Sequence, residues 1–278
     1  MREKEPSRTA HGAAGHRAAH QAIEGGRIFK DPLAVTILGK DAAAIIAWAR
    51  LNPASRGIRF FIAARSEIAE ARLAEGIETR GVGQLVVLGA GLDTFAYRNP
   101  FGERLKVFEV DHPETQAWKR RRLAETGIAV PDSLTYAPVN FETEDLRQSL
   151  ERAGFDPKMR SVFICLGVVP YLTLDAIRAT LGAIANLPGG AEVVFDYADP
   201  PATLDKVQAA AHRARARRVA AIGEPFLSYF NPNELHALLA EAGFRMIDDL
   251  GPRALISRYG GDAGQRGDTG GHVVWAAT

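Results

Sequence analysis

The sequence predicts an α/β fold built on a doubly wound, largely parallel sheet of about seven strands, preceded by a helical segment. After about residue 81, short aliphatic and β-branched runs alternate with longer helical stretches, which is typical of βαβ units around a parallel sheet. Before that point the chain is rich in Ala, Ile, Leu and Arg, in helical patterns broken by Gly and Pro. We therefore expect a helical N-terminal cap over residues 1–80 and an α/β core over residues 81–278.

Composition and charge exclude several classes of protein. Hydrophobic residues make up 46% of the 278 positions and charged residues 24%, which is ordinary for a packed globule. The formal net charge of +1 gives no overall attraction to nucleic acid or to an anionic membrane, so neither is expected as a partner. The longest apolar run, residues 162–172, is shorter than the roughly 20 residues of a membrane span. A single cysteine, Cys165, and a charged N-terminus without a signal peptide predict a cytoplasmic protein.

Five near-parallel strands are predicted from the aliphatic runs of the core. They cover Gln84–Gly89, Leu105–Val110, Leu134–Val139, Ser161–Leu166 and Ala191–Tyr197. A helix is predicted over Leu174–Asn186, because Pro188-Gly189-Gly190 stops it and leads into the fifth strand.

The C-terminal part of the chain is predicted to complete the sheet. Residues 198–230, with a helical Ala- and Arg-rich stretch, are expected to form a lid segment, followed by a helix near Pro232–Ala242. Phe244–Asp248 and His272–Ala277 are expected to pair as a final antiparallel hairpin. The glycine-rich stretch Gly260–Gly271 between them is expected to be a surface loop.

A glycine loop follows the first predicted strand. Gly89-Ala90-Gly91 allows a tight turn and lets a ligand approach the backbone. Asp111 follows the second strand, 20 residues beyond Gly91 (111 − 91 = 20), where an acid can accept hydrogen bonds from both hydroxyls of a ribose. Loop and acid together indicate a ribose-containing ligand.

The residues after the loop favour S-adenosyl-L-methionine over a dinucleotide. The dinucleotide fingerprint places a third small residue where this chain has Thr94, and Asp93 just before it would repel a pyrophosphate. S-adenosylmethionine has no phosphate and carries a positive sulfonium and ammonium, which suit a carboxylate. Alternatively, the glycines only form a turn between strand and helix, and Asp93 only caps the next helix.

The chain resembles the leucine carboxyl methyltransferase-like family, including its bacterial branch of small-molecule O-methyltransferases. The most specific matching blocks are Gly89-Ala90-Gly91-Leu92-Asp93-Thr94 and Glu109-Val110-Asp111-His112-Pro113. Shorter matches run in the family's order over nearly the whole chain: Arg8-Thr9-Ala10, Asp31-Pro32-Leu33-Ala34, Ala64-Arg65, Val169-Pro170-Tyr171-Leu172-Thr173 and Gly223-Glu224-Pro225-Phe226. The resemblance implies a Rossmann-like class I methyltransferase sheet whose last hairpin is antiparallel.

The resemblance also implies which residues bind the cofactor. Arg65 matches the arginine that contacts the carboxylate of the methionine part, and the loop at Gly89 lies under the same moiety. Asp111, with His112 beside it, matches the ribose-binding acid. The remaining positions are the loop residues Ala90 and Gly91, the pair Asn140-Phe141 beside adenine in place of an Asp-Leu pair, and Leu166. Phosphatase-modifying members have a glutamate where this chain has Leu166, so a phosphatase tail is not expected as the substrate.

Three side chains are candidates for the chemistry itself. Tyr171 and Tyr197 lie just beyond strand or helix ends, where ligand sites of open α/β sheets gather, and His112 follows the ribose-binding acid. Each tyrosine, like Tyr229, is alternatively an amphipathic residue at the edge of the core. A carboxylate acceptor is already anionic at neutral pH and needs no general base, whereas a hydroxyl acceptor would need His112 or a tyrosine.

Several other residues have a structural role as the alternative to a functional one. Glu109, inside a strand, is expected either to meet a ligand or an arginine such as Arg65, or to occupy an edge position. His16 and His20 have a metal-compatible spacing, but no further ligands accompany them, so no metal is expected. Four arginines, expected on an exposed helix face or on a lid that meets an anionic substrate, are Arg213, Arg215, Arg217 and Arg218. Cys165 is expected to be an inert buried strand residue.

These observations predict an S-adenosylmethionine-dependent methyltransferase that O-methylates a small molecule, with a carboxylate as the favoured acceptor. Two alternatives stay open at this point: an NAD(P)-dependent oxidoreductase and a protein that binds S-adenosylmethionine without catalysis. The identity of the acceptor and the oligomeric state lie beyond the sequence.

Overall fold

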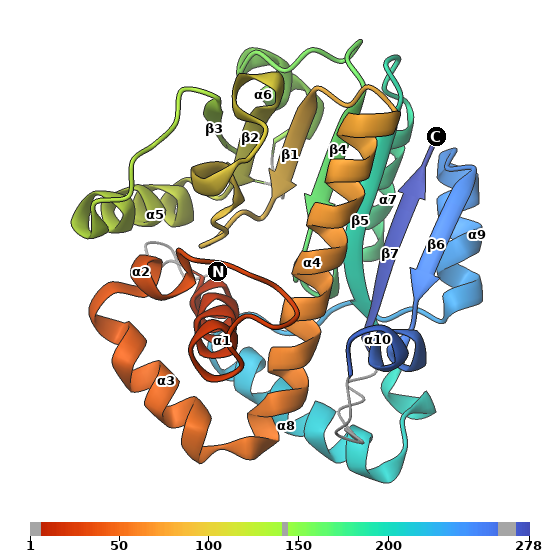
Figure 1. The fold of residues 1–278 in the computed structure, drawn as a ribbon. Coiled ribbons are helices and arrows are strands. Elements are labelled where there is room, and N and C mark those ends of the chain that lie inside the picture. The colour runs from red at the N-terminus through yellow and green to blue at the C-terminus, as the bar shows by residue number, and fades with distance from the viewer. Residues whose placement is uncertain (1–6, 141–143, 261–270) are drawn as a thin grey trace.

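The computed structural model describes residues 7–140, 144–260 and 271–278, and its centre is one seven-stranded sheet (Figure 1). The strand order is β3-β2-β1-β4-β5-β7-β6. The strands are β1 (Gln84–Leu88), β2 (Lys106–Asp111), β3 (Leu134–Pro138), β4 (Ser161–Cys165), β5 (Ala191–Ala198), β6 (Met246–Leu250) and β7 (Gly271–Ala277). All seven predicted strands are present, with ends that differ by at most two residues.

Five strands run parallel and the last two close the sheet in the opposite sense. In the centre, Val86 of β1 is in register with Phe108 of β2 and with Phe163 of β4. β7 is antiparallel to both β5 and β6, so it lies between them. This arrangement confirms the predicted doubly wound sheet with an antiparallel final hairpin.

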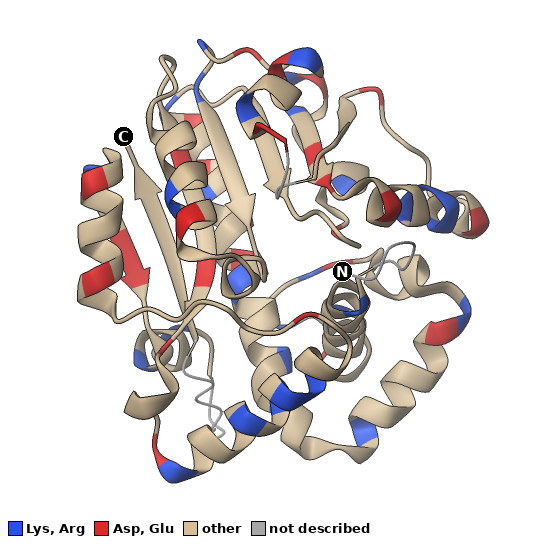
Figure 2. Ribbon diagram, turned by 180° about the vertical axis from the view of Figure 1, so that it is seen from behind, with Lys and Arg blue, Asp and Glu red and all other residues tan. Residues whose placement is uncertain are grey.

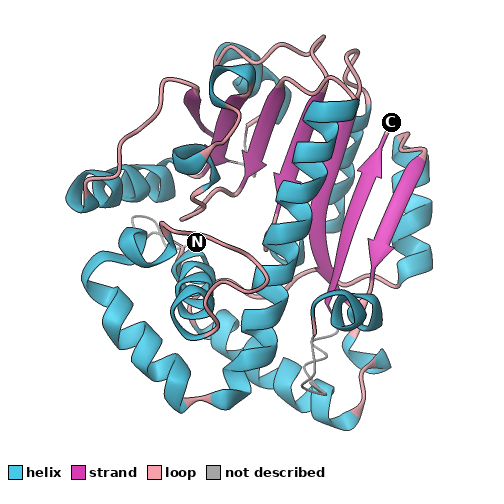
Figure 3. Cartoon of the chain, in the orientation of Figure 1, coloured by secondary structure: helices cyan, strands magenta, loops and turns pink. Residues whose placement is uncertain are grey.

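Helices cover both faces of the sheet (Figure 3). They are α1 (Arg8–Ile23), α2 (Ala34–Leu38), α3 (Ala42–Leu51), α4 (Arg56–Thr79), α5 (Pro113–Thr126), α6 (Leu146–Arg152), α7 (Leu174–Ala185), α8 (Lys206–Ala221), α9 (Pro232–Ala242) and α10 (Pro252–Tyr259). One core packs Ile177 and Leu181 of α7 and Leu235 of α9 against the sheet. The core on the other face packs Ile68 and Leu73 of α4 there.

Helix α4 differs from its predicted place in the N-terminal cap. It has 24 residues, about 36 Å at 1.5 Å per residue, and its buried side chains reach β4, β5 and β7. The helix therefore forms part of one layer of the α/β sandwich, and it also contacts α1. Helix α10 was not predicted, because its eight residues begin at Pro252 and run into the glycine-rich stretch. Most of that stretch, residues 261–270, lies outside the described residues.

The N-terminal helices pack against the glycine-loop end of the sheet (Figure 1). A small core joins Ala14 and Ala18 of α1 and Ile37 of α2 to Leu92 after β1 and Leu123 of α5. Arg17 of α1 adds a polar link, because its Nε lies 3.2 Å from Asp31 and its guanidinium also donates to the Leu92 carbonyl. Helix α1 is thereby fixed directly to the segment that follows β1.

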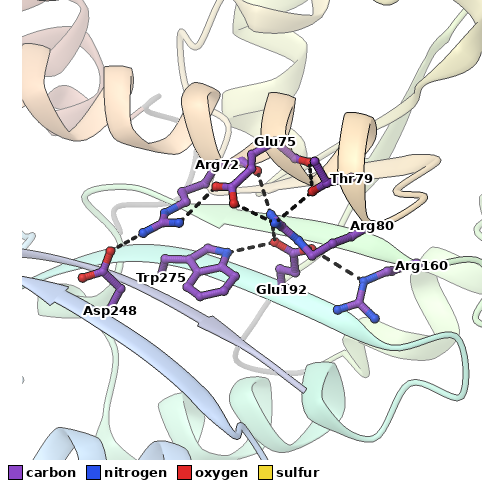
Figure 4. Close-up of polar contacts among 8 residues, drawn as sticks. All are labelled: Arg72, Glu75, Thr79, Arg80, Arg160, Glu192, Asp248 and Trp275. Atoms are coloured by element: carbon purple, nitrogen blue, oxygen red, sulfur yellow. Dashed lines mark hydrogen bonds and ion pairs between the residues drawn. The ribbon is translucent and has the colours of Figure 1, made fainter.

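A buried carboxylate organises the opposite end of β5 (Figure 4). Glu192 is fully buried and accepts hydrogen bonds from Arg80 at 2.7 and 3.0 Å and from the Trp275 indole at 2.9 Å. Arg72 lies over the Trp275 ring at 4.6 Å and also binds Asp248 of β6. These contacts join α4 to β5, β6 and β7 at the edge of the sheet remote from the glycine loop.

Within the described parts of the chain, no helix combines the length and the apolar character that crossing a membrane requires.

Candidate functional site

The glycine loop after β1 is a tight turn with neighbours on both sides. Gly89 has φ +65° and Gly91 φ +47°, in the left-handed region that favours glycine. The N–H groups of Gly89 and Ala90 donate to the Val110 carbonyl at 2.8 and 3.1 Å. A Cβ on Gly89 would lie 2.5 Å from Val168, and one on Gly91 would lie 2.8 Å from the Cβ of Ala10. Larger residues are excluded by backbone geometry and by space.

Asp111 ties the end of β2 to this loop. Its Oδ2 accepts from the Gly91 N–H at 2.6 Å, and its Oδ1 accepts from the His112 N–H at 2.7 Å. Burial raises the pKa of Asp111, and these two backbone N–H groups oppose the shift. The predicted loop and acid are in direct contact. His112 lies beside them and caps α5, since its Nδ1 accepts from the Glu114 N–H at 3.3 Å.

Arg65 reaches the neighbouring loop from α4. Its Nη1 lies 2.8 Å from Oδ2 of Asp196 in β5, and Oδ1 of Asp196 accepts from the Gly167 N–H at 2.6 Å. A Cβ on Gly167 would lie 2.9 Å from the guanidinium. The Nε of Arg65 is buried without a hydrogen-bond partner among the described residues. Asp196 was not predicted to take part, although its position near the carboxyl end of a buried strand was an available signal.

Tyr171 lies next to this arginine, in the short turn after β4. Its ring is 5.3 Å from that of Phe226. Burial raises the pKa of Tyr171 to about 12, Glu224 adds to the rise and Arg65 opposes it. Glu224 in turn accepts from the Thr9 N–H at 3.3 Å, so the start of α1 meets the turn after α8 at this place. Neither Thr9 nor Glu224 was singled out from the sequence except as part of the family motifs.

Tyr197 points into a second polar cluster, near the C-terminal hairpin. Its hydroxyl donates to Asp249 at 2.7 Å and lies 3.0 Å from Nδ1 of His272, whose ring stacks on the tyrosine at 4.6 Å. His236 also contacts Asp249, at 2.9 Å. Burial acts to raise the pKa of Asp249, but hydrogen bonds from His272, Tyr197 and His236 hold that pKa below its ordinary value. Tyr197 as a catalytic residue stays a prediction, with its hydroxyl engaged in this cluster.

The remaining predicted cofactor residues border Asp111 or Arg65. The Val139 N–H donates to the Asp111 carbonyl at 2.9 Å, which places Asn140 next to the candidate ribose site. Leu166 precedes Gly167 and packs against the core that includes α4. Phe141 lies outside the described residues.

Glu109 pairs with a lysine, where the sequence suggested an arginine such as Arg65 or an edge position. It lies in a central strand, is 1% exposed, and pairs with Lys119 of α5 at 2.8 Å. The Tyr97 hydroxyl donates to it at 3.2 Å. The edge position is wrong, since β2 lies between β3 and β1. The lysine could not be predicted as the partner, because the contact depends on how α5 packs over β2. Cys165 is buried in β4, and this burial raises the pKa of its thiol to about 12.

The segment after the loop is shorter than a helix. Residues Phe95–Arg98 form a single 3-10 turn, and the Asp93 carboxylate accepts from the Phe95 N–H at 2.8 Å. Asp93 therefore fixes the start of this turn, where the sequence suggested the cap of a helix.

Residues 7–140, 144–260 and 271–278 contain no group of three or more His, Cys, Asp or Glu side chains arranged to hold a metal ion. His20 is buried, and its Nε2 accepts from the Ile28 N–H at 3.3 Å, while its Nδ1 lies 3.4 Å from Glu24. His16, four residues earlier, interacts electrostatically with Arg59, Arg65 and Arg218.

Comparison with known proteins agrees with the motifs seen in the sequence. The sequence profile of the family described as leucine carboxyl methyltransferase matches residues 10–185. The chain belongs to this family. A candidate S-adenosyl-L-methionine-dependent methyltransferase of Bacillus subtilis, YktD, is 36% identical over 176 residues, which cover 62% of this chain and 57% of that protein. A relative from Mycobacterium bovis with the same description is 30% identical over 180 residues, covering 62% and 51%. The chain thus spans about half the length of the curated relatives it matches.

Solved structures agree on the fold. A candidate methyltransferase from Thermobifida fusca superposes with a TM-score of 0.57 at 17% identity, over 99% of this chain and 96% of that one. A DUF574 family protein from Streptomyces avermitilis gives a TM-score of 0.53 at 15% identity, over 99% and 98%. At these identities the likeness bears on the fold alone, and it confirms the α/β class predicted from the sequence.

Proposed function

We propose that this protein is an S-adenosyl-L-methionine-dependent methyltransferase that O-methylates a small molecule, with a carboxylate as the acceptor group. The observation that carries the proposal is the hydrogen bond from the Gly91 N–H to Asp111. It brings a glycine loop and a carboxylate together as a nucleoside requires. The names of the relatives point to the same cofactor.

The residues present fit this cofactor. Each oxygen of Asp111 accepts one backbone N–H, so further lone pairs remain for the two ribose hydroxyls. Arg65, with its buried and unpartnered Nε, is suited to the carboxylate of the methionine part. Asp196 balances the charge of that arginine and holds it against the Gly167 loop. Asn140 and the predicted Phe141 would border adenine.

The bound cofactor would supply an electrophilic methyl group on a sulfonium. The chain's own contribution is to align the acceptor and to exclude water, because methyl transfer is an in-line displacement. A carboxylate acceptor arrives ionised and needs no base. Tyr171, whose pKa lies near 12, keeps its proton at neutral pH and can donate a hydrogen bond that orients the acceptor beside Arg65. His112, next to Asp111, would contact the ribose. Tyr197 would hold the carboxyl end of β5 in place through its hydrogen bond to Asp249.

Binding of S-adenosylhomocysteine and NAD, measured side by side by calorimetry, tests the cofactor. We expect micromolar binding of the first and none of the second, with at least a tenfold loss in Asp111→Ala. Tight binding of NAD alone would support an oxidoreductase. Transfer of a labelled methyl group to a panel of small carboxylates and phenols then tests the reaction. Cofactor binding without turnover on any member would support the non-catalytic alternative, toward which the substituted position Leu166 points.

A further inference from the structure

The four arginines of α8 differ in burial and in their electrostatic neighbours. The helix carries Arg213, Arg215, Arg217 and Arg218, and Figure 2 shows the concentration of basic residues along it. His212 and Val219 mark the buried side of the helix. Arg215 lies between them in the helical repeat and is half-buried, whereas Arg213, Arg217 and Arg218 are exposed. Arg218 follows Arg215 by three positions and therefore lies on the same side of the helix.

Arg215 is directed toward Tyr171. Its guanidinium lies 5.9 Å from the centre of the Phe226 ring, which in turn packs against Tyr171. Burial lowers the pKa of Arg215, Tyr171 and Tyr229 counteract this electrostatically, and Arg218 adds to the lowering. Arg215 therefore interacts electrostatically with both Tyr171 and Arg218.

His16 of α1 connects this region to α4. Its imidazole interacts electrostatically with Arg59, Arg65 and Arg218. Burial and these three cations together lower the pKa of His16 to about 4, so the ring is neutral at pH 7. Arginines of α4 and α8 therefore interact electrostatically with the same neutral histidine of α1.

The charges at this place are unequally balanced. Arg59 is bound by Glu24 at 2.7 Å and Arg65 by Asp196 at 2.8 Å. Neither Arg215 nor Arg218 has an ion pair or hydrogen bond to a carboxylate within residues 7–140, 144–260 and 271–278. Glu224 acts on Tyr171 from the turn after α8, but its Oε2 is engaged by Ser7 and Thr9 of the α1 start. Arg215 and Arg218 therefore outnumber Glu224, the carboxylate nearby, and the site has a net positive charge.

We propose that Arg215, Arg218 and His16 form a subsite for a second anionic group of the methyl acceptor, a carboxylate or phosphate distinct from the group that is methylated. This inference rests on the proposed function and specifies its substrate class. An acceptor carboxylate loses its charge as it becomes an ester, so cations that contact it would stabilise the ground state more than the transition state and slow the reaction. Cations that contact a second, unreacting anion hold it equally in both states and only position the acceptor.

Anion binding provides the first test. Inorganic phosphate and malonate are titrated, at constant ionic strength, into the full-length protein and the variants R215Q/R218Q and R213Q/R217Q. The second variant is the matched control, because it removes two arginines from the outward side of the same helix. We expect binding at least tenfold weaker in R215Q/R218Q than in wild type and unchanged in the control. Absence of binding to wild type, or equal losses in both variants, would overturn the inference.

His16 supplies an independent readout. With histidine labelled for NMR, phosphate should raise the pKa of His16 in wild type, since a nearby anion stabilises the imidazolium, and should leave it unchanged in R215Q/R218Q. The variant R215K/R218K keeps the charge and should retain part of the effect, which separates loss of the subsite from loss of folding.

S-adenosylhomocysteine binding, measured on the same samples, keeps the two proposals separable. If wild type binds phosphate through Arg215 and Arg218 but does not bind S-adenosylhomocysteine, the proposed function fails and the anion subsite stands. If S-adenosylhomocysteine binds and the anions do not distinguish R215Q/R218Q from the control, the subsite fails alone. Once turnover is found, matched monocarboxylate and dicarboxylate or phosphorylated acceptors distinguish the anion: R215Q/R218Q should raise KM about tenfold for the doubly anionic member only.

Discussion

The carboxylate of Glu109 lies 2.8 Å from the ammonium of Lys119, and each side chain is only 1% exposed. The pair joins β2 to α5 two residues before Asp111. It therefore supports the end of the strand that carries the candidate ribose site. Removing one partner would leave the other as an uncompensated buried charge. Such losses cost about 3–5 kcal/mol, whereas replacing both partners with neutral groups costs much less.

We therefore expect Lys119→Met to lower the free energy of unfolding by about 3–5 kcal/mol, measured by urea denaturation at pH 7. The double variant Glu109→Gln with Lys119→Met should recover most of this loss, because it buries no lone charge. A single variant as stable as wild type would show that the pair is dispensable.

Glu109 also predicts a dependence of stability on pH. Burial raises the pKa of Glu109 to about 7 from the ordinary value of 4.5, against the opposing charge of Lys119. Between these two pH values the native carboxyl keeps its proton and the unfolded one has lost it. The free energy of unfolding contributed by this group should therefore fall as pH rises from about 4.5 to 7. Urea midpoints from pH 4.5 to 7.5 should show this fall in wild type, and Glu109→Gln should flatten it. Parallel profiles would contradict the assignment.

The close approach of Ala10 to Gly91 predicts that a side chain at position 91 would displace α1. In Gly91→Ala, a residue with a Cβ must adopt the left-handed backbone of Gly91, which costs about 1–2 kcal/mol. The added Cβ would also lie only 2.8 Å from the Cβ of Ala10. We expect α1 to be displaced, seen as faster amide hydrogen exchange over residues 8–23, with weaker S-adenosylhomocysteine binding. Adding Ala10→Gly should relieve the contact and restore part of the protection. Gly102→Ala is the matched control, since its φ is +56° and nothing lies within 4 Å of the added Cβ. It should leave α1 unchanged.

The two candidate tyrosines should respond differently to loss of their hydroxyls. Tyr197→Phe removes a donor to Asp249 and should cost about 1–2 kcal/mol of stability, measured by denaturation, with a small effect on turnover. Tyr171→Phe should lower kcat/KM about tenfold with little change in stability, because its proposed role is to orient the acceptor. If Tyr197→Phe instead abolished turnover in a protein of unchanged stability, a catalytic role for Tyr197 would be supported.

Sequence reasoning predicted the sheet well because its signals are local. Each strand is a short aliphatic run bounded by polar or glycine-containing segments, and helix α9 begins and ends at its predicted residues Pro232 and Ala242. The 20-residue spacing from Gly91 to Asp111 also predicted a contact, and the structure contains it. These features depend on residues close in the chain or on a well-defined motif.

Long-range partners could not be predicted in the same way. Asp196 meets Arg65 across 131 positions, and Glu224 meets Thr9 across 215. Which face of α4 packs on the sheet decides the first contact, and its weakly amphipathic sequence gives no guide. Which arginine of α8 lies toward Tyr171 likewise depends on how the helix packs against residues distant in the chain.

The docking of α1 has a consequence for the order in which the chain folds. This helix precedes the whole sheet in the chain, yet its anchors at Leu92 and Glu224 lie 75 positions beyond Arg17 and 217 beyond Ser7. Long loops must close before these contacts form, and such closures are late events in folding. We therefore expect helix α1 to dock only after most of the sheet has formed. When the native protein opens locally, departure of α1 would expose the glycine loop to solvent, because Ala10 lies against Gly91.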